Sequence, residues 1–394
     1  MNKRKEPFPA WPFFEDDEIA AAVEVLKSGK VNYWTGEEGK SFEKEYAAHT
    51  GTRHAVALSN GTVALEMALK AAGIGKGDEV VVTPRTFVAS ASSIALCGAR
   101  PIFADVDRES GNISAATISP VLTSRTRAII PVHLGGWPCD MDPIMDLARK
   151  NGLVVIEDCA QAHGGKYHGR RVGSIGDMGA FSFCQDKIIT TGGEGGMITT
   201  DNEEYWERIW SFKDHGKSYQ AVFNREHPPG FRWLHESFGT NGRMTEMQAS
   251  IGRVALTKLP RWLEIRRRNA EIYTRLLSGL SAIHIPNPPL DIEHACYRFY
   301  LYIIPERLQP DWSRDRIMNE VGKLGRPGLS GTCCEIYLEQ AFSAAELQPG
   351  DRLPNARWLT ENSLMLPVHP ALSSEDIEDI AGTVVQVVKE ASGV

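Results

Sequence analysis

Short apolar runs alternate with longer amphipathic stretches between about residues 54 and 200. The runs HAVALS, DEVVVTP, RPIFADVD, RAIIPVHL and LVVIEDCA have the length and the Val and Ile content of buried strands. Between them lie stretches with helical periodicity, such as TVALEMALKAAGI and MDPIMDLARKNG. This alternation predicts an α/β domain in which helices flank a mostly parallel, doubly wound sheet.

The pattern changes after residue 200. The segment SYQAVFNREHPPGFRWLHESFGTNGRM is polar and aromatic, and we expect it to be rich in loops. A long helix is predicted from about Thr245 to Leu277, followed by a strand, YRFYLYIIP, and a capped terminal helix, SSEDIEDIAGTVVQVVKEA. We therefore expect a large domain over residues 1–255 and a smaller α+β domain over residues 256–394, on which the N-terminal segment can pack.

Composition and charge exclude several classes of protein. The chain has 394 residues and a net charge of -7, so no basic excess points to nucleic acid or to an anionic membrane. The N-terminus lacks an apolar signal region, and no segment approaches the roughly eighteen uninterrupted apolar residues of a membrane span. The seven cysteines show no zinc-site spacing. We expect reduced thiols, no bound metal and a place in the cytoplasm.

Several catalytic motifs are missing from the sequence. The two GKS tripeptides lack the glycine five residues earlier that a phosphate-binding P-loop needs, because those positions hold Trp34 and Ser211. Neither a G-x-S-x-G elbow nor an H-E-x-x-H pair is present. Nucleotide hydrolysis, acyl transfer and zinc hydrolysis are therefore poorly supported.

Two junctions between a strand and the following segment could bind a ligand. SNGTVAL opens a helix directly after a strand, so its free backbone N–H groups could hold an anion, although an ordinary N-cap has the same composition. VVIEDCAQAHGG is an apolar strand that ends in Glu157 and Asp158. Ligands of open α/β sheets bind at the carboxyl ends of strands, although a helix cap or a surface acid is the alternative there.

The stretch FSFCQDKIITTGGEGG places Lys187 after an apolar run and before small residues. Burial would lower the pKa of this lysine toward the free amine that attacks a carbonyl, although a surface lysine is the commoner case. If the carbonyl is the aldehyde of pyridoxal 5'-phosphate (PLP), the site also needs an acid, an anion cradle and a flat group over the ring. The sequence offers these in turn as Asp158, as Ser182 with the turn at Gly61 and Thr62, and as Phe87 in TPRTFVAS. The glycines at 192, 193, 195 and 196 would leave room for the chain to turn tightly beside a cofactor, although a plain strand connection is the alternative.

The order SNGT, TFVASAS, EDCAQAHG, FSFCQDKIITTGGEGG and GTNGRMTEMQASIG resembles the DegT/StrS sugar aminotransferase family of fold type I PLP enzymes. The resemblance implies that Lys187 joins the cofactor and later moves a proton, and that Asp158 pairs with the pyridine nitrogen. Gln161 matches a contact to the ring, and Ser182 and Thr62 match phosphate contacts. Asn241, in TNGRM, matches an asparagine that reaches the phosphate from the neighbouring subunit, which implies a homodimer with a shared site.

The resemblance also implies a reaction. We expect an aminotransferase that moves nitrogen from glutamate or glutamine to a keto sugar that is linked to a nucleotide. A lysine at position 187, where a dehydratase branch of the fold has histidine, favours transamination. Two alternatives stay open: an acceptor from a keto-cyclitol or aminohydroxybenzoate pathway, and a non-catalytic PLP-binding regulator. The roles of Cys184 and Glu194 are not assigned.

Overall fold

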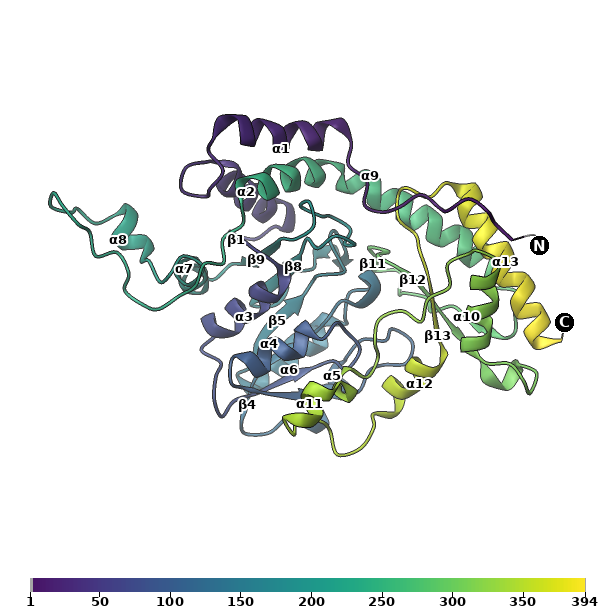
Figure 1. Cartoon of the computed structure of the whole chain (residues 1–394). Helices are drawn as coiled ribbons and strands as arrows, with labels where there is room; N and C mark the ends of the chain where they lie inside the picture. Colours follow the sequence, from purple (N-terminus) through teal and green to yellow (C-terminus); the bar gives the residue numbers. More distant parts are fainter. Residues whose placement is uncertain (1–2, 394) are drawn as a thin grey trace.

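The computed structural model describes residues 3–393, and its centre is a seven-stranded sheet with the strand order β1-β9-β8-β5-β4-β2-β3 (Figure 1). β8, β5, β4, β2 and β3 run parallel, and β9 runs antiparallel to both of its neighbours. The mostly parallel sheet predicted from the sequence is therefore confirmed. The strands are β1 His54–Leu58, β2 Glu79–Val82, β3 Arg100–Phe103, β4 Thr126–Ile130, β5 Val154–Asp158, β8 Met178–Ser182 and β9 Gly196–Thr200.

The central strands bury side chains on both faces of this sheet. Val80 and Val82 of β2 pack with residues of α3 (Gly61–Ala71) and α4 (Ala89–Leu96). Val81, between them, packs with residues of α6 (Met141–Asn151) on the other face. A strand that is covered on both faces needs no polar positions, which explains the continuous apolar runs in the sequence.

The C-terminal region has its own antiparallel sheet and core. The sheet has the order β10-β12-β13, and helices α10 (Arg314–Lys323) and α13 (Ser374–Ser392) contribute to its core. The long helix α9 (Glu246–Leu277) packs with the central region at Ala255 and with the C-terminal core at Tyr273. The predicted division between residues 255 and 256 falls inside this continuous helix and stays a prediction. The strands are β10 Ile283–His284, β12 Phe299–Ile303 and β13 Ser363–Leu366.

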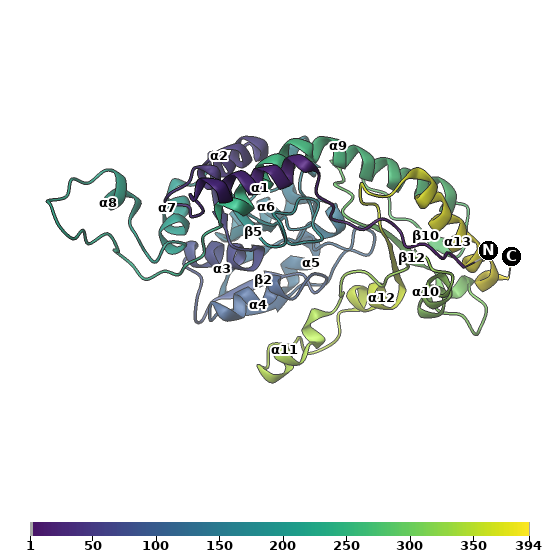
Figure 2. The ribbon, with the colours of Figure 1, turned by 45° about the horizontal axis from the view of Figure 1, so that its top comes forward.

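The N-terminal segment connects both regions. Residues 3–14 run between α13 and α1 (Asp16–Ser28), and α1 packs along α9 (Figures 1 and 2). Arg4 forms ion pairs of 3.0 Å with both Asp376 and Asp379 of α13. The indole N–H of Trp11 donates to the carbonyl of Lys187 at 2.9 Å. The segment therefore fastens the backbone of Lys187 to the C-terminal region.

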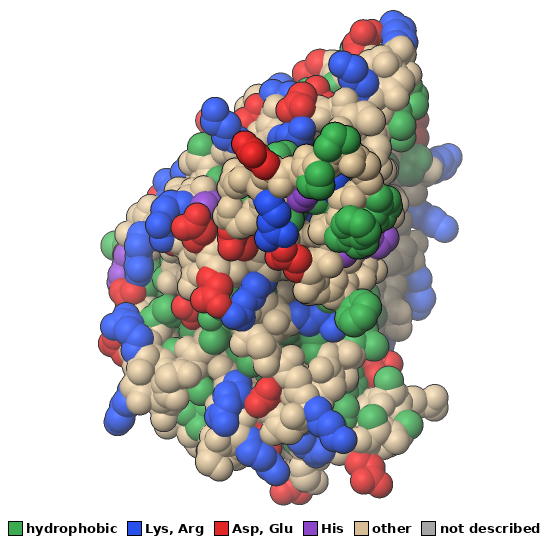
Figure 3. Space-filling model, turned by 90° about the vertical axis from the view of Figure 1, so that its left-hand side faces the viewer, with side chains coloured by type: hydrophobic (Ala, Val, Ile, Leu, Met, Phe, Trp, Pro, Cys, Tyr) green, Lys and Arg blue, Asp and Glu red, His purple; other side chains and the backbone are tan. Residues whose placement is uncertain are grey.

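An arm of the chain projects from the body between residues 215 and 240 (Figures 1 and 2). Only the short helix α8 (Tyr219–Phe223) interrupts its loops, in agreement with the sequence pattern. Phe231 and Trp233 on the arm are 77% and 79% exposed, and their rings pack edge to face. Figure 3 views the molecule from this side and shows hydrophobic side chains gathered in one part of the face, among charged ones.

The remaining elements are short or peripheral. Within residues 3–393, no helix is long and apolar enough to cross a bilayer. A third small sheet has the order β11-β6-β7. The bounds of the other elements are β6 Lys166–Tyr167, β7 Arg170–Arg171, β11 Ile292–Glu293, α2 Glu38–Thr50, α5 Ala115–Ile118, α7 Glu203–Phe212, α11 Gln340–Ala344 and α12 Pro354–Asn362.

Candidate active site

A cavity of about 570 Å³ opens where β5 and β8 end and where α3 begins. This is the edge of the sheet at which α/β proteins bind ligands. All the predicted site residues except Asn241 line the cavity: Gly61, Thr62, Phe87, Asp158, Gln161, Ser182 and Lys187. The structure thus brings together residues that are as much as 126 positions apart in the chain, from Gly61 to Lys187 (187 − 61). Their individual roles stay predictions.

Asp158 is the last residue of β5 and is only 5% exposed. Its carboxylate accepts hydrogen bonds from the hydroxyl of Ser90 at 2.7 Å and from the N–H of Ala160 at 3.1 Å. Burial raises the pKa of Asp158, and these two hydrogen bonds offset only part of that effect. Within residues 3–393 no cation forms an ion pair with this acid, so a protonated ring nitrogen of PLP would supply the missing partner.

The beginning of α3 forms an anion cradle with the end of β8. The side chain of Asn60 caps α3 by accepting the N–H of Val63 at 2.9 Å, which leaves the first-turn N–H groups of Gly61 and Thr62 for a ligand. A Cβ atom at position 61 would lie 2.6 Å from the Cβ of Ser182, so only glycine allows this serine to stand so close. The N–H groups of Gly61 and Thr62 and the hydroxyl of Ser182 can donate hydrogen bonds to a phosphate. The residues present therefore fit PLP.

The side chain of Lys187 is 15% exposed, and its Nζ lies 3.4 Å from Oδ1 of Asp186. Burial lowers the pKa of this amine, but the phenol of Tyr297 and the carboxylate of Asp186 raise it by more, and the net shift is upward. The sequence-based expectation of a lowered pKa is therefore wrong for the chain without cofactor. The correction arises because Tyr297 and the half-exposed carboxylate of Asp186 stabilise the ammonium form that burial alone would disfavour.

Gln161 and Phe87 complete the cavity wall. The side-chain oxygen of Gln161 accepts the N–H of Gly135 at 2.8 Å, which leaves the NH₂ group of Gln161 as the end that can donate to a ligand. Phe87 is 66% exposed at the cavity. An aromatic side chain left this open has a face free to cover a flat ring.

Asn241 is exposed at the base of the arm and does not line the cavity. Its neighbour Gly242 donates its N–H to the carbonyl of Lys213 at 2.9 Å, and the carbonyl of Gly242 accepts the N–H of Ser59 at 2.9 Å. The loop that carries Asn241 is thus fixed beside the beginning of α3 while the side chain faces outward. Whether a second copy brings Asn241 to a site stays a prediction.

Two of the glycines after Lys187, Gly195 and Gly196, need a second correction. The sequence suggested that they leave room for a cofactor. A Cβ atom at Gly195 would instead lie 2.2 Å from the hydroxyl of Thr191, and one at Gly196 would lie 2.3 Å from the carbonyl oxygen of Asn60. These two glycines therefore make room for the protein's own chain, beneath the turn that opens α3.

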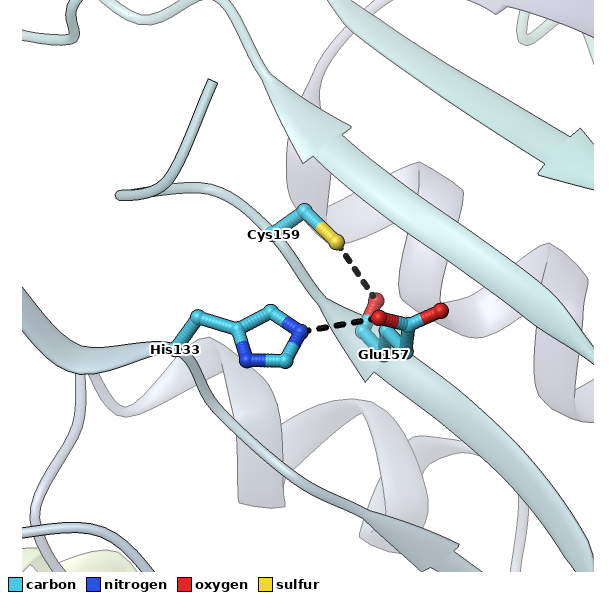
Figure 4. Close-up of side chains that lie close together, drawn as sticks. All are labelled: His133, Glu157 and Cys159. Atoms are coloured by element: carbon cyan, nitrogen blue, oxygen red, sulfur yellow. Dashed lines mark hydrogen bonds and ion pairs between the residues drawn. The ribbon is translucent and has the colours of Figure 1, made fainter. Parts of the chain in front are cut away.

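His133, Glu157 and Cys159 form a buried cluster close enough to hold a metal ion (Figure 4). Their hydrogen bonds instead indicate a structural role. Nδ1 of His133 accepts the N–H of Cys139 at 3.0 Å, so Nε2 carries the proton and donates it to Glu157 at 2.9 Å. The carboxylate of Glu157 also accepts the N–H groups of residues 173, 175 and 176. Glu157 anchors that loop, and no lone pair of His133 remains for a metal.

The sequence did not identify two contacts of the site. Ser90, whose hydroxyl bonds Asp158, lies in TFVASAS one helical turn after Thr86, with which it also shares a hydrogen bond of 2.8 Å. The sequence could have indicated Ser90, because it lies in the TFVASAS motif that carries Phe87. Tyr297, whose hydroxyl donates to Asp186 beside Lys187, is 110 residues from Lys187 (297 − 187), and no local pattern connects the two.

The profile of the DegT/DnrJ/EryC1/StrS aminotransferase family matches residues 13–385. The chain belongs to this family. An aminotransferase from Psychrobacter cryohalolentis, known from an X-ray structure, is 51% identical, with a TM-score of 0.96 over 98% of this chain and 100% of that one. The GDP-perosamine synthase of Caulobacter vibrioides is 36% identical over 90% of this chain and 92% of its own length.

A candidate sugar aminotransferase from Streptococcus pneumoniae, solved in its PLP form, is 27% identical, with a TM-score of 0.86 over 98% of this chain and 99% of that one. Family membership and these structures show that the protein is a PLP-dependent aminotransferase of the sugar aminotransferase family. The cavity described above fits that cofactor by its cradle and by its unpaired acid.

Proposed function

We propose that the protein transfers an amino group from glutamate or glutamine to a keto sugar linked to a nucleotide. The observation that carries the proposal is the convergence of Lys187, Asp158 and the cradle at Gly61, Thr62 and Ser182 on one cavity. The similarity to a GDP-perosamine synthase supports a nucleotide-linked acceptor. A cavity of about 570 Å³ accommodates the cofactor and the reacting sugar, so the nucleotide would lie outside it.

Each group of the cavity has a task in this proposal. Bound PLP supplies an electron sink that stabilises the negative charge left when a Cα proton is removed. Asp158 would keep the ring nitrogen protonated, and Gly61, Thr62 and Ser182 would bind the phosphate. Lys187 would hold the resting cofactor through its amine. When free, its Nζ would take the Cα proton of the donor and, in the second half, return a proton to the carbon that receives nitrogen.

We further propose that two copies share their active sites. The exposed Asn241 lies at the base of an arm whose aromatic side chains are open to solvent, as a segment awaiting a partner would be. A mixture of two inactive variants tests this arrangement. If Asn241 acts across the dimer, a Lys187→Ala subunit combined with an Asn241→Ala subunit rebuilds one intact site, and activity returns on mixing. Activity that stays absent after subunit exchange would contradict a shared site.

Absorbance and half-reactions test the chemistry. Wild-type protein with PLP should show the visible band of a lysine-bound cofactor, and Lys187→Ala should lose it. Glutamate or glutamine should then convert the bound PLP to pyridoxamine phosphate. A panel of nucleotide-linked keto sugars and keto-cyclitols identifies the acceptor by return of the PLP spectrum. A response to keto-cyclitols alone would replace the proposed acceptor, and failure of every amino donor would favour the non-catalytic regulator.

A further inference from the structure

Asp186 directly precedes Lys187 and is held on three sides. Its Oδ1 lies 3.4 Å from Nζ of Lys187, and its Oδ2 accepts the hydroxyl hydrogen of Tyr297. Oδ2 also accepts a hydrogen bond of 3.2 Å from Nη2 of Arg298. Tyr297 and Arg298 stand immediately before β12, so residues of the C-terminal region reach the loop that carries the reactive lysine.

The two residues before β12 are themselves fixed in place. The carbonyl of Gly135 accepts the N–H of Tyr297 at 2.9 Å and that of Arg298 at 3.3 Å. The N–H of the same Gly135 donates to Gln161, which lines the cavity. The ring of Tyr297 is buried, and its centroid lies 5.2 Å from Nζ of Lys187. The residues that bind the half-exposed side chain of Asp186 are therefore hydrogen-bonded, through Gly135, to the wall of the cavity.

We propose that Asp186 is a positioning residue, which orients the Lys187 amine whenever that lysine is not joined to the cofactor, and that Tyr297 and Arg298 hold the Asp186 carboxylate for this task. The inference rests on the proposed role of Lys187. A lysine side chain has many rotamers, and it must return to one place twice in each reaction cycle. A fixed carboxylate beside its Nζ limits where the amine can go.

The charges around Lys187 agree with this task. The groups that act on it are Asp186 and Cys184 on its own loop, Tyr297 before β12, Asp158 at the end of β5, and His163 a few residues later. Arg298 acts on Asp186. The nearby Lys187 ammonium, the hydroxyl of Tyr297 and Arg298 lower the pKa of Asp186 despite its partial burial, so Asp186 is ionised at neutral pH. An ionised neighbour stabilises the ammonium that Lys187 becomes after it takes a proton.

Competitive acylation measures the contact directly. The full-length protein loaded with pyridoxamine phosphate, in which Lys187 is not attached to the cofactor, is treated with trace acetic anhydride between pH 6 and pH 11. Mass spectrometry then follows modification of the Lys187 peptide. Asp186→Asn should move the titration of Lys187 to lower pH, with up to about tenfold more reactive amine at pH 8 for each pKa unit lost. An unchanged titration would overturn the inference.

Two further variants separate positioning from folding. Asp17→Asn is the matched control, because Asp17 pairs with Lys258 at 2.6 Å and should alter only the labelling of that lysine. Tyr297→Phe removes the hydrogen bond to Asp186 but keeps the ring, and should move the Lys187 titration in the same direction by less. If Asp186→Asn does not fold, Tyr297→Phe decides the question alone, and no movement there would overturn the proposal.

Kinetics supply the second measurement. Asp186→Asn should lower kcat of the glutamate half-reaction by about tenfold or more while KM stays near its wild-type value, and Asp186→Glu should recover part of the loss. An equal loss in Asp186→Glu and Asp186→Asn would show that the carboxylate has only a structural role. If Lys187→Ala kept full activity, the proposed function would be wrong. The labelling experiment would still show whether Asp186 shifts the titration of Lys187.

Discussion

Two buried charged residues show how the burial of a single charge lowers the stability of the fold. Asp158 is a carboxylate placed at the end of an apolar strand, with hydrogen bonds but, within residues 3–393, no cation close enough to form an ion pair. Lys213 is an ammonium with no hydrogen-bond partner for its Nζ among the described residues. The rings of Tyr33 and Trp210, at 3.8 and 5.1 Å, face it instead. Burial makes both charges costly. The carboxylates of Glu43 and Asp214 offset only part of this cost for Lys213, and a bound cofactor could provide a partner for Asp158.

Asp158→Asn should stabilise the cofactor-free protein and weaken the holoenzyme. Because the pKa of Asp158 is raised in the folded state, its ionisation destabilises the fold at neutral pH, and this penalty disappears as pH falls below the ordinary carboxyl range. Asparagine removes the charge but keeps both contacts: its Oδ1 can accept the N–H of Ala160, and its NH₂ group can donate to the hydroxyl of Ser90, which can then donate to Thr86. Urea unfolding of the cofactor-free protein should show a more stable variant at pH 7 and no difference in acid, while kcat falls by about a hundredfold or more.

A control for Asp158→Asn is Asp177→Asn. Asp177 also has a pKa raised by burial, and it accepts the N–H of Val155 at 2.7 Å, but it lies outside the cavity. Its replacement should leave PLP affinity unchanged. A loss of PLP affinity in both variants would contradict the specific pairing of Asp158 with the cofactor.

Lys213→Met should stabilise the cofactor-free protein at pH 7. Burial lowers the pKa of Lys213 to about 8, so the folded state holds a penalised charge below pH 8, and the penalty shrinks as pH rises toward the ordinary lysine value of 10.5. The variant should be more stable by on the order of 2 kcal/mol at pH 7, and the two proteins should converge near pH 10. Urea unfolding at both pH values measures the difference.

The matched control is Lys217→Met, four residues away. Lys217 pairs with Asp214 at 3.0 Å, so its charge has a counter-charge and its removal should not stabilise the protein at pH 7. A stability gain in Lys213→Met that does not change with pH would show that side-chain packing, and not the buried charge, is responsible.

At the scale of elements, the contact between β9 and the beginning of α3 sets the geometry of the anion cradle. Gly196 is the first residue of β9, and its Cα lies beneath the carbonyl of Asn60, the residue that caps α3. The central sheet therefore contacts the cradle at Gly196, where a side chain would have no room. The same strand pairs with β1 and β8, so it cannot move away without loss of sheet hydrogen bonds.

Gly196→Ala should displace the first turn of α3 and weaken PLP binding. The added Cβ atom would meet the carbonyl oxygen of Asn60 at 2.3 Å, and overpacking of this kind costs about 1–3 kcal/mol. Thermal unfolding and PLP titration measure the two effects. Gly279→Ala is the control, since no atom lies within 4 Å of its added Cβ, and it should be close to neutral. An unaffected PLP affinity in Gly196→Ala would contradict the coupling.

At the scale of the whole molecule, Arg85 connects the central sheet to the C-terminal sheet. It follows β2, is fully buried, and donates to the hydroxyls of Tyr302 and Ser363 at 3.2 and 3.4 Å. Those residues belong to β12 and β13. Within residues 3–393 no carboxylate pairs with its guanidinium, which rests instead 4.8 Å from the ring centroid of Tyr300.

Gly111→Ala should separate the two regions and lower the unfolding temperature. A Cβ atom at position 111 would lie 1.8 Å from Nη1 of Arg85, in a backbone conformation with φ of +70° that already disfavours alanine. Gly73→Ala is the matched control, with φ of +74° and no atom within 4 Å of the added Cβ. The two variants share the backbone strain, so an additional loss of about 2 kcal/mol or more in Gly111→Ala measures the contact with Arg85. Equal losses would contradict the role of this contact.

The sequence by itself determined the class of fold and most of the cavity. Strand and helix periodicities are local, so the runs before Asp158 and Ser182 identified strands whose ends carry functional groups. The motif around Lys187 and the SNGT turn are short local stretches, and in their order along the chain they carried the resemblance to a family that implied the chemistry. Asn60, Gly61 and Thr62 could be assigned to a helix beginning for the same reason.

Only the tertiary structure decided which groups act on those residues. The upward pKa shift of Lys187 depends on Tyr297, and the hydrogen bonds of His133 depend on Glu157 and on Cys139. The space that Gly196 leaves is taken by Asn60, more than a hundred positions away (196 − 60 = 136). Electrostatic and packing energies fall off with distance in space and not along the chain, so these effects appear only when the sheet has brought distant residues together.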